Sequence, residues 1–398
     1  MGGDRLRGSA IETARWRVAA AGAALQALPV EARAEAIAAA CTRVRAEVQR
    51  GALGDALAAS SGLSVEGVRW GIESTLSILE PNALAALAAG VTRGPQAPVT
   101  VVLAGNVLTA CARPLLLPLL AGVPVLAKAS SKDDALARAL SAALREVDAK
   151  VGDACEVLSF AHGDAALDDA LVRAALRDDG CVNVYGSDET VAAIEAAARA
   201  IDPGARVIGH GHGLGLCYVA RDAVSEATAA AVALDVCAYD QRGCLSPHAV
   251  YVEGSAGARF AELLHAALGE REAEMPRGAV PQEAAAQQLQ WRGVAAAIGQ
   301  LHATATHAVS YEGDGALRPS PGYRNVAILD CPRGTAELTE RAHALGGHLK
   351  ALGIAGDTDV KHELAALAPY VCPVSEMQSP GLSVELDGLP VMPGVGVG

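Results

Sequence analysis

Aromatic side chains and positive charges are scarce in this chain of 398 residues, and no apolar run is long and unbroken. Aromatic residues make up 3% of the sequence, and the formal net charge is −13. A nucleic-acid partner is therefore excluded, because its phosphates would be repelled over the whole surface. The longest apolar stretch, residues 114–127, is too short to span a bilayer and is broken by Pro118 and Pro124.

Targeting signals and cysteine pairs are also missing. The chain begins Met-Gly-Gly-Asp-Arg-Leu-Arg, without the apolar core of a secretory signal, so we expect a soluble protein of the cytoplasm. The nine cysteines are odd in number and mostly lie in apolar runs, which is not typical of a disulfide framework. No CxxC pair occurs, and His210 and His212 have no third ligand nearby, so we expect no metal site.

Alanine and glycine are abundant, and the apolar fraction of 51% is enough for a large core. The length predicts two domains. Residues 12–89 have helical spacing and form an α-helical lead-in. Apolar β-type runs then alternate with helical segments, which predicts an α/β fold with parallel strands. The first four runs are residues 98–104, 123–128, 155–160 and 181–185.

A second α/β unit follows a glycine-dense strand, turn and strand at residues 206–219. We expect a cofactor-binding domain at 1–234, whose helical segment is 1–95, a catalytic domain at 235–380 and a C-terminal tail at 381–398. The later strands are predicted at 250–253, 303–309, 325–329 and 353–355, the helices at 225–236, 257–268, 281–297 and 336–352, and a proline-bounded loop at 370–380.

Polar residues follow the predicted strands at the edge where parallel sheets place ligands. Asn106 follows the first strand, and Lys128 ends the second. Gly186 and Ser187 open a helix after the fourth, where backbone amides could hold a phosphate. Each residue has a structural alternative: Asn106 as a turn former, Lys128 as a solvated lysine and Ser187 as an ordinary helix cap.

One cysteine lies in a polar loop directly before a β-type run. The stretch Asp-Gln-Arg-Gly-Cys-Leu-Ser-Pro-His, residues 240–248, sets Cys244 between glycine and proline. This context is typical of a nucleophilic thiol on a loop at a strand edge, although a cysteine can also simply fill a small buried space. His248 could carry a proton, but a structural histidine fits as well, and we leave it out of the catalytic set.

Four separated segments resemble, in the correct order, motifs of the aldehyde dehydrogenase superfamily. They are Gly105-Asn106, Lys128-Ala129-Ser130, Tyr185-Gly186-Ser187 and Gly243-Cys244. Within that superfamily, residues 240–248 and 372–380 look most like the fatty acyl-CoA reductases (LuxC-like) of bacterial bioluminescence. The resemblance implies an aldehyde-dehydrogenase-like fold with two Rossmann-like α/β domains behind the helical lead-in.

The resemblance also implies an activity, the reduction of an acyl-CoA to the aldehyde through a covalent acyl-cysteine. Cys244 would be the nucleophile, and Asn106 would help to bind the oxyanion. NADPH is expected rather than NADH, because NAD-preferring relatives carry a glutamate three residues after the lysine, where this chain has Ser131. The implied cofactor-binding residues are Lys128, Ser130, Ser131, Gly186 and Ser187.

The chain departs from the hydrolytic dehydrogenases at residues 207–211, which lack the glutamate that activates water in those enzymes. This absence suits an acyl-enzyme that exchanges with a thiol. Two alternatives stay open: an acyl-phosphate reductase of the same superfamily, for which only Arg242 offers a nearby basic group, and a non-catalytic acyl-carrying or scaffold subunit. The expected partners are the acyl-CoA substrate, further copies in a homo-oligomer and an acyl-transferring enzyme.

Overall fold

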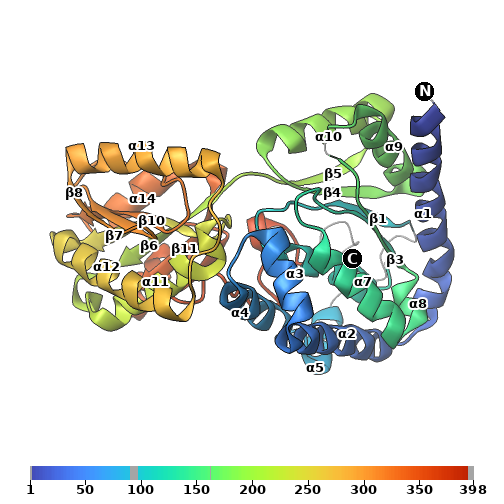
Figure 1. The fold of residues 1–398 in the computed structure, drawn as a ribbon, viewed down its shortest axis with the longest axis horizontal. Coiled ribbons are helices and arrows are strands. Elements are labelled where there is room, and N and C mark those ends of the chain that lie inside the picture. The colour runs from blue at the N-terminus through green and yellow to red at the C-terminus, as the bar shows by residue number, and fades with distance from the viewer. Residues whose placement is uncertain (1, 90–96, 162, 393–398) are drawn as a thin grey trace.

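The computed structural model describes residues 2–89, 97–161 and 163–392. The expected helical lead-in is confirmed, and Ser64 caps α4 by accepting a hydrogen bond from the Gly67 N–H at 3.0 Å. The lead-in consists of α1 (Gly2–Ala27), α2 (Val30–Arg50), α3 (Ala52–Ser61), α4 (Val65–Leu76) and α5 (Pro81–Ala88). Helix α1 lies along the outer edge of one lobe, against α9 (Ala165–Ala175) (Figure 1).

The first sheet has five parallel strands in the order β3-β2-β1-β4-β5. The strand order reverses between β1 and β4, so the ligand crevice of such a sheet is expected at the carboxyl ends of these strands. The strands are β1 (Val99–Val102), β2 (Val125–Lys128), β3 (Cys155–Leu158), β4 (Cys181–Tyr185) and β5 (Arg206–His210), with helices α6 (Ala112–Leu120), α7 (Ala135–Val147), α8 (Ala149–Gly152) and α10 (Asp188–Ile201).

The second sheet has seven strands in the order β12-β11-β6-β7-β10-β9-β8 and forms the other lobe of Figure 1. Within the described residues, its strands pair in parallel except for β8 with β9. The strands are β6 (Leu214–Val219), β7 (Pro247–Glu253), β8 (Gln300–Ala303), β9 (Ala308–Tyr311), β10 (Asn325–Cys331), β11 (Leu349–Ala355) and β12 (Tyr370–Pro373). The helices are α11 (Glu226–Cys237), α12 (Gly257–Glu274), α13 (Gln282–Ile298), α14 (Thr335–His343) and α15 (Thr358–Leu364).

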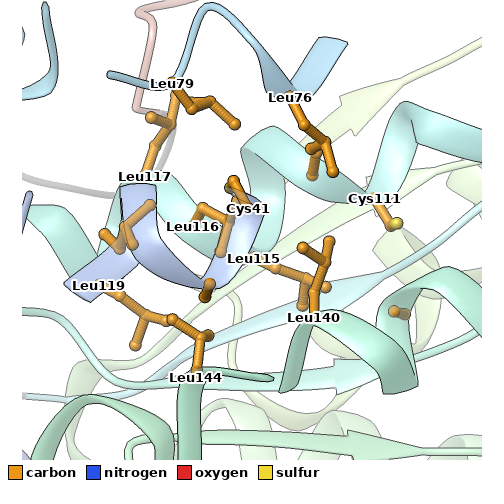
Figure 2. Close-up of a cluster of buried hydrophobic side chains, with 14 of the residues drawn as sticks. Cys41, Leu76, Leu79, Cys111, Leu115, Leu116, Leu117, Leu119, Leu140 and Leu144 are labelled. Carbon is orange, nitrogen blue, oxygen red and sulfur yellow. The ribbon is translucent and has the colours of Figure 1, made fainter. Parts of the chain in front are cut away.

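Both faces of each sheet are covered by helices, so neighbouring strand residues are buried on opposite sides. In the first sheet Val101 packs in the cluster that holds α2, α6 and α7, whereas Val102 packs with α1 and α9. This two-residue alternation explains why the strands read as continuous apolar runs. Figure 2 shows leucines of α6 and α7 meeting Cys41 of α2 and Leu76 of α4, so aliphatic side chains fill this core.

The structure differs from the sequence predictions in three segments. The helix expected at 336–352 ends at His343, and strand β11 begins at Leu349. The strand expected at 303–309 is the antiparallel pair β8 and β9, and the loop expected at 370–380 begins with β12. Short strands in glycine-rich or proline-flanked sequence give weak periodicity, which accounts for these errors.

The strands of residues 206–219 belong to different sheets, so the chain crosses from one sheet to the other between His210 and Leu214. The domain boundary at residue 234 stays a prediction. In the part of the chain that the structure describes, no helix combines the length and apolar character needed to cross a membrane.

Candidate active site

Cys244 lies on the loop between α11 and β7, in the wall of a cavity of about 1300 Å³. All nine cysteines belong to the described residues and all are free. Eight are buried, and Cys244 is the one that is partly exposed. Burial and the Asp387 carboxylate raise the pKa of its thiol to about 11, with Lys350 opposing them. The thiol is therefore accessible from the cavity but protonated at neutral pH.

The turn before the cysteine has an uncommon backbone conformation. Tyr239, Asp240 and Gln241 have φ values of 51°, 51° and 60°, although none of them is glycine. A left-handed conformation costs roughly 1–2 kcal/mol for each such residue. Strain of this kind persists only where surrounding contacts determine it, and it clusters at functional sites.

Buried polar contacts hold the first part of this turn. The Tyr239 hydroxyl lies 2.7 Å from the Thr109 Oγ1. Asp240 forms an ion pair with Arg324 at 2.7 Å, and its other oxygen accepts the Gly278 N–H at 3.0 Å. The side chains of Asp240 and Arg324 are 2% and 1% exposed, and Arg324 also pairs with Glu272 at 2.6 Å, so the loss of Arg324 would leave the buried Asp240 carboxylate without its ion pair.

Gln241 fixes the last part of the turn through its amide. Its Nε2 donates to the carbonyls of Pro247 at 2.7 Å and Asn325 at 2.8 Å, and its Oε1 accepts the Asn325 N–H at 2.8 Å. Sequence reasoning gave Gln241 no role, since a single glutamine in a loop carries no recognisable signal. The cysteine loop is thus tied to strands β7 and β10.

Asn106 lies beside the cysteine loop, as its position after β1 predicts. Its side chain is exposed and lines the cavity, and Nδ2 donates to the Arg242 carbonyl at 3.1 Å. Gly243 follows in a confined place, because a Cβ there would lie 3.2 Å from the Val107 Cγ2. The segments after β1 and before β7 therefore meet two residues ahead of Cys244.

Gln378 is a buried polar residue at the cavity that sequence reasoning gave no chemical role. It is 6% exposed, and its Nε2 has no hydrogen-bond partner among the described residues. Its Oε1 accepts a hydrogen bond of 3.5 Å from Ser246. The preceding loop is held by Asp235, whose carboxylate accepts the N–H groups of Ser375 at 2.6 Å and Met377 at 3.1 Å. Burial outweighs these bonds and raises the pKa of Asp235 to about 7.

Lys128, Ser130 and Ser131 line another part of the same cavity. Lys128 is 4% exposed, lies 5.3 Å from the centre of the Phe160 ring and forms no ion pair with a described residue. Burial lowers its pKa, although the more distant Asp168 opposes the shift. A buried ammonium without an ionic partner is costly, so these side chains fit a polar group of a ligand.

Gly186 and Ser187 lie at the cavity where β4 leads into α10. Ser187 accepts the Thr190 N–H at 3.3 Å, so the alternative reading of a helix cap describes this contact. The backbone at Gly186 is closely packed, since a Cβ there would lie 3.2 Å from the Thr190 side chain. The N-terminus of this 14-residue helix faces the same cavity as Cys244, which suits the pyrophosphate of a dinucleotide.

His210, Lys350 and Asp387 form a cluster at the cavity that sequence reasoning did not assemble. Asp387 lies in the predicted tail and contacts both other residues: the His210 Nδ1 is 2.7 Å from its Oδ2, and the Lys350 Nζ is 3.1 Å from its Oδ1. Nothing in the sequence links residues so far apart. By contrast, the His248 Nδ1 bonds the Ser320 carbonyl at 2.9 Å, and burial lowers its pKa, as expected of a structural histidine.

Across residues 2–89, 97–161 and 163–392, no group of three His, Cys, Asp or Glu side chains is arranged to hold a metal ion. The cavity brings together the thiol of Cys244, the ammonium of Lys128 and the N-terminus of α10. Its polar groups are suited to a dinucleotide cofactor and to a carbonyl substrate at Cys244.

Comparison with known proteins identifies the fold. A gamma-glutamyl-gamma-aminobutyraldehyde dehydrogenase from Burkholderia cenocepacia J2315 matches with a TM-score of 0.77 at 15% identity, over 98% of this chain and 87% of that one. An NAD-dependent aldehyde dehydrogenase from Sinorhizobium meliloti matches with a TM-score of 0.71 at 16% identity, over 92% and 80% of the chains. The fold is that of the aldehyde dehydrogenases.

A bifunctional proline utilization A (PutA) protein also matches, with a TM-score of 0.73 at 16% identity, over 95% of this chain. This chain spans only 41% of the length of that protein. No curated protein matches the sequence. The model of the family described as acyl-CoA reductase (LuxC) matches residues 88–388, which is most of the chain, and the protein therefore belongs to that family.

Proposed function

We propose that this protein reduces an acyl-CoA to the aldehyde with NADPH, through an acyl group carried on Cys244. The observation that carries the proposal is the shared cavity, which Cys244 lines together with Lys128, Gly186 and Ser187. A thiol and groups suited to the ribose and pyrophosphate of a dinucleotide thus face one space. Membership of the acyl-CoA reductase family supports an acyl thioester as the substrate.

In the proposed reaction, the sulfur of Cys244 forms a bond to the thioester carbonyl carbon. The bond from that carbon to the CoA sulfur then breaks, which leaves an acyl-cysteine. The nicotinamide cofactor, when bound, supplies the hydride for the carbonyl carbon of this acyl group. The bond to Cys244 breaks last, so that the aldehyde departs and the cysteine is regenerated.

Asn106 and the backbone N–H of Cys244 are the proposed oxyanion donors. A side-chain amide has two N–H groups, and the Arg242 carbonyl takes one of those of Asn106. The other stays available for a substrate oxygen, while the bond to Arg242 orients the amide. Removing a donor of this kind typically lowers turnover by ~10²-fold or more.

Lys128, Ser130 and Ser131 are proposed to hold the adenosine ribose, and Gly186 and Ser187 the pyrophosphate. The buried Lys128 ammonium would gain an acceptor in a ribose hydroxyl. Ser131 and Lys132 are exposed at the cavity, and neither would repel a 2′-phosphate. This charge pattern favours NADPH over NADH.

An apolar region of the cavity suits the acyl chain. Its lining includes Ile78, Leu79, Leu117, Pro118, Leu382 and Met392. These residues come from the lead-in, from α6 and from the segment after the second sheet. Apolar side chains gathered at one cavity bind a hydrocarbon chain through the removal of both surfaces from water.

The acyl-phosphate alternative depends on Arg242, the basic residue nearest to the cysteine in the sequence, and most of this guanidinium is bound to backbone carbonyls. Its Nε donates to the Tyr239 carbonyl at 3.1 Å, and its Nη1 donates to the Ser61 carbonyl at 2.8 Å. These two bonds hold the loop, whereas the Nη2 of Arg242 is buried without a hydrogen-bond partner among the described residues, and Arg242 lines the cavity. An acyl phosphate would need a free cation close to the thiol.

The test is intact-protein mass spectrometry after incubation with a long-chain acyl-CoA in the absence of NADPH. We expect one acyl adduct that maps to Cys244 and disappears on addition of NADPH, with release of one equivalent of aldehyde. The Cys244→Ser variant provides the control and should carry no thioester adduct. If acyl-CoA gives no adduct and an acyl phosphate does, the protein is an acyl-phosphate reductase and the proposal is wrong.

A further inference from the structure

His210 and Asp387 form an oriented imidazole–carboxylate pair at the cavity that contains Cys244. His210 ends β5, and its Nδ1 lies 2.7 Å from the Asp387 Oδ2. An ionised carboxylate only accepts hydrogen bonds, so Nδ1 carries a hydrogen, and in the neutral form of this imidazole Nε2 is the acceptor. His210 is 8% exposed, and within the described residues its Nε2 is buried without a hydrogen-bond partner.

The groups around this pair favour an ionised Asp387. Burial alone would raise the pKa of Asp387, but the hydrogen bond from His210 and the charge of Lys350 outweigh burial and lower it. The Tyr185 ring stacks on the imidazole, with centroids 4.0 Å apart and planes 6° from parallel. On the adjoining turn, the Asp188 Oδ1 accepts the backbone N–H of His212 at 2.7 Å. The imidazole ring is thus held in one orientation.

A short glycine-rich turn connects His210 to the cysteine loop. Gly213 packs against Lys350, since a Cβ there would lie 2.2 Å from the Lys350 Cγ. Gly215 then donates its N–H to the Ser246 carbonyl at 2.9 Å, two residues beyond Cys244. The same stretch that carries His210 therefore contacts the loop of the thiol, and both side chains line one cavity.

The thiol of Cys244 needs a proton acceptor. Burial and the Asp387 carboxylate raise its pKa to about 11, although Lys350 lowers it. The thiolate, which is the nucleophile, then makes up only about one part in 10⁴ at pH 7. A neutral imidazole at the cavity can remove this limit by accepting the proton as the new bond forms.

We propose that His210, oriented by Asp387, carries the proton between Cys244 and the sulfur of the departing CoA. This inference rests on the proposed function, of which it specifies the acid and the base. In this proposal His210 is the catalytic residue of the pair, because its Nε2 exchanges the proton with the reacting sulfur atoms. Asp387 is a positioning residue that fixes the tautomer and the ring orientation.

The proton balance closes over the first half of the reaction. His210 Nε2 accepts the proton of the Cys244 thiol as the sulfur bonds to the carbonyl carbon. The carbon–sulfur bond to CoA then breaks, and the protonated imidazole gives that proton to the CoA sulfur. The products are the acyl-cysteine, free CoA thiol and a neutral imidazole ready for the next cycle.

The test measures alkylation of Cys244 by iodoacetamide between pH 6 and 10, which requires neither acyl-CoA nor NADPH. We expect His210→Asn to slow alkylation at pH 7 by ~10²-fold or more. Asparagine keeps a donor for Asp387 but has no base, so the deficit should shrink about tenfold for each pH unit until the thiol ionises unaided. His212→Asn is the matched control, because His212 is exposed, and its profile should follow the wild type.

Two further measurements keep the proposal testable if His210→Asn is poorly folded. Imidazole added to His210→Gly should restore alkylation in proportion to its concentration, and Asp387→Asn should shift the pH profile while NADPH affinity stays unchanged. A His210→Asn protein with a wild-type alkylation profile and weakened NADPH binding would overturn the proposal and assign His210 to the cofactor. If the wild type shows the base-dependent profile but forms no acyl adduct, the proposed function fails and the proton transfer stands.

Discussion

Side chains at the end of β2 bear directly on the choice of cofactor. Lys128 is buried and forms no ion pair with a residue that the structure describes, whereas Ser131 and Lys132 are exposed at the cavity. A lysine can bind the ribose of either dinucleotide. The discrimination therefore depends on the charge of the exposed side chains close to the 2′ position.

A carboxylate at position 131 should weaken the proposed preference for NADPH. We expect Ser131→Glu to weaken NADPH binding by about tenfold or more, because two negative charges at a few ångströms repel one another by ~1–4 kcal/mol at a protein surface. Binding of NADH should change little. Isothermal titration with both cofactors provides the measurement, and Ser131→Gln is the control of equal size. Unchanged NADPH affinity in Ser131→Glu would show that the 2′-phosphate does not bind near residue 131.

His307 is a buried titratable residue outside the cavity. Its Nε2 lies 3.0 Å from the Nδ1 of His265, and the residue is 2% exposed. Burial, followed by the nearby His265 and Arg292, lowers the pKa of His307 to about 4 from an ordinary 6.5, against a hydrogen bond with His265. The folded protein therefore keeps His307 neutral where the unfolded chain would protonate it.

This difference predicts a loss of stability in mild acid. Below pH 6.5 His307 binds a proton in the unfolded chain, whereas in the folded protein it binds one only near pH 4. The free energy of unfolding therefore falls as the pH drops from 6.5 to 4. Between pH 6.5 and 5 the loss is about 2 kcal/mol. In urea unfolding, the free energy of unfolding of His307→Gln should depend less on pH than that of the wild type. His343→Gln, which changes an exposed histidine, should behave like the wild type. The same pH dependence in all three proteins would contradict the lowered pKa of His307.

At the scale of elements, two helices begin with the same cap. Ser187 accepts the Thr190 N–H at 3.3 Å at the start of α10, and Ser225 accepts the Thr228 N–H at 3.2 Å at the start of α11. Only the first of these lies at the cavity. A comparison of the two serines therefore distinguishes the contribution of a helix cap to stability from a role of Ser187 in cofactor binding.

Both cap deletions should cost similar stability but affect the cofactor differently. We expect Ser187→Ala and Ser225→Ala each to lower the free energy of unfolding by ~1 kcal/mol, because each loses a hydrogen bond to a helix N–H. Ser187→Ala alone should weaken NADPH binding. Chemical denaturation and cofactor titration of both variants test this. An equal NADPH affinity in the two variants would leave Ser187 as a cap and nothing more.

At the scale of the whole molecule, the segment after β12 returns to the first lobe. Arg113 of α6 binds this segment through three carbonyls, those of Val384 at 3.1 Å, Pro380 at 2.9 Å and Gly381 at 2.5 Å. Met392 is buried in the core of the helical lead-in, near the end of the described chain. Hydrogen bonds from a charged donor contribute ~1.5–3 kcal/mol each, so Arg113 is a main anchor of the segment.

Loss of this anchor should release the segment. We expect Arg113→Ala to make residues 381–392 sensitive to limited proteolysis and to reduce acylation of Cys244, since the segment lines the cavity. Mass spectrometry of the digest gives the cut sites. Arg138→Ala is the control, because it removes only an exposed ion pair with Asp134 on one helix. Protection of residues 381–392 in Arg113→Ala would show that apolar packing alone holds them.

Sequence reasoning reached the features that local pattern encodes. The strand ends that carry Asn106 and Lys128 follow from changes of apolar period, and Cys244 was distinguished by its polar loop. The three left-handed residues before the cysteine could not be predicted, because their conformation depends on tertiary partners such as Arg324. The pair of His210 and Asp387 was equally hidden, since 177 residues separate its members.

Asp387 joins the two sheets through its two carboxylate oxygens. One oxygen binds His210 at the end of β5 in the first sheet, and the other binds Lys350 on β11 in the second. A rocking motion of one lobe against the other would stretch at least one of these bonds. This carboxylate therefore links the two lobes, and a change in their relative orientation requires one of its two ion pairs to break first.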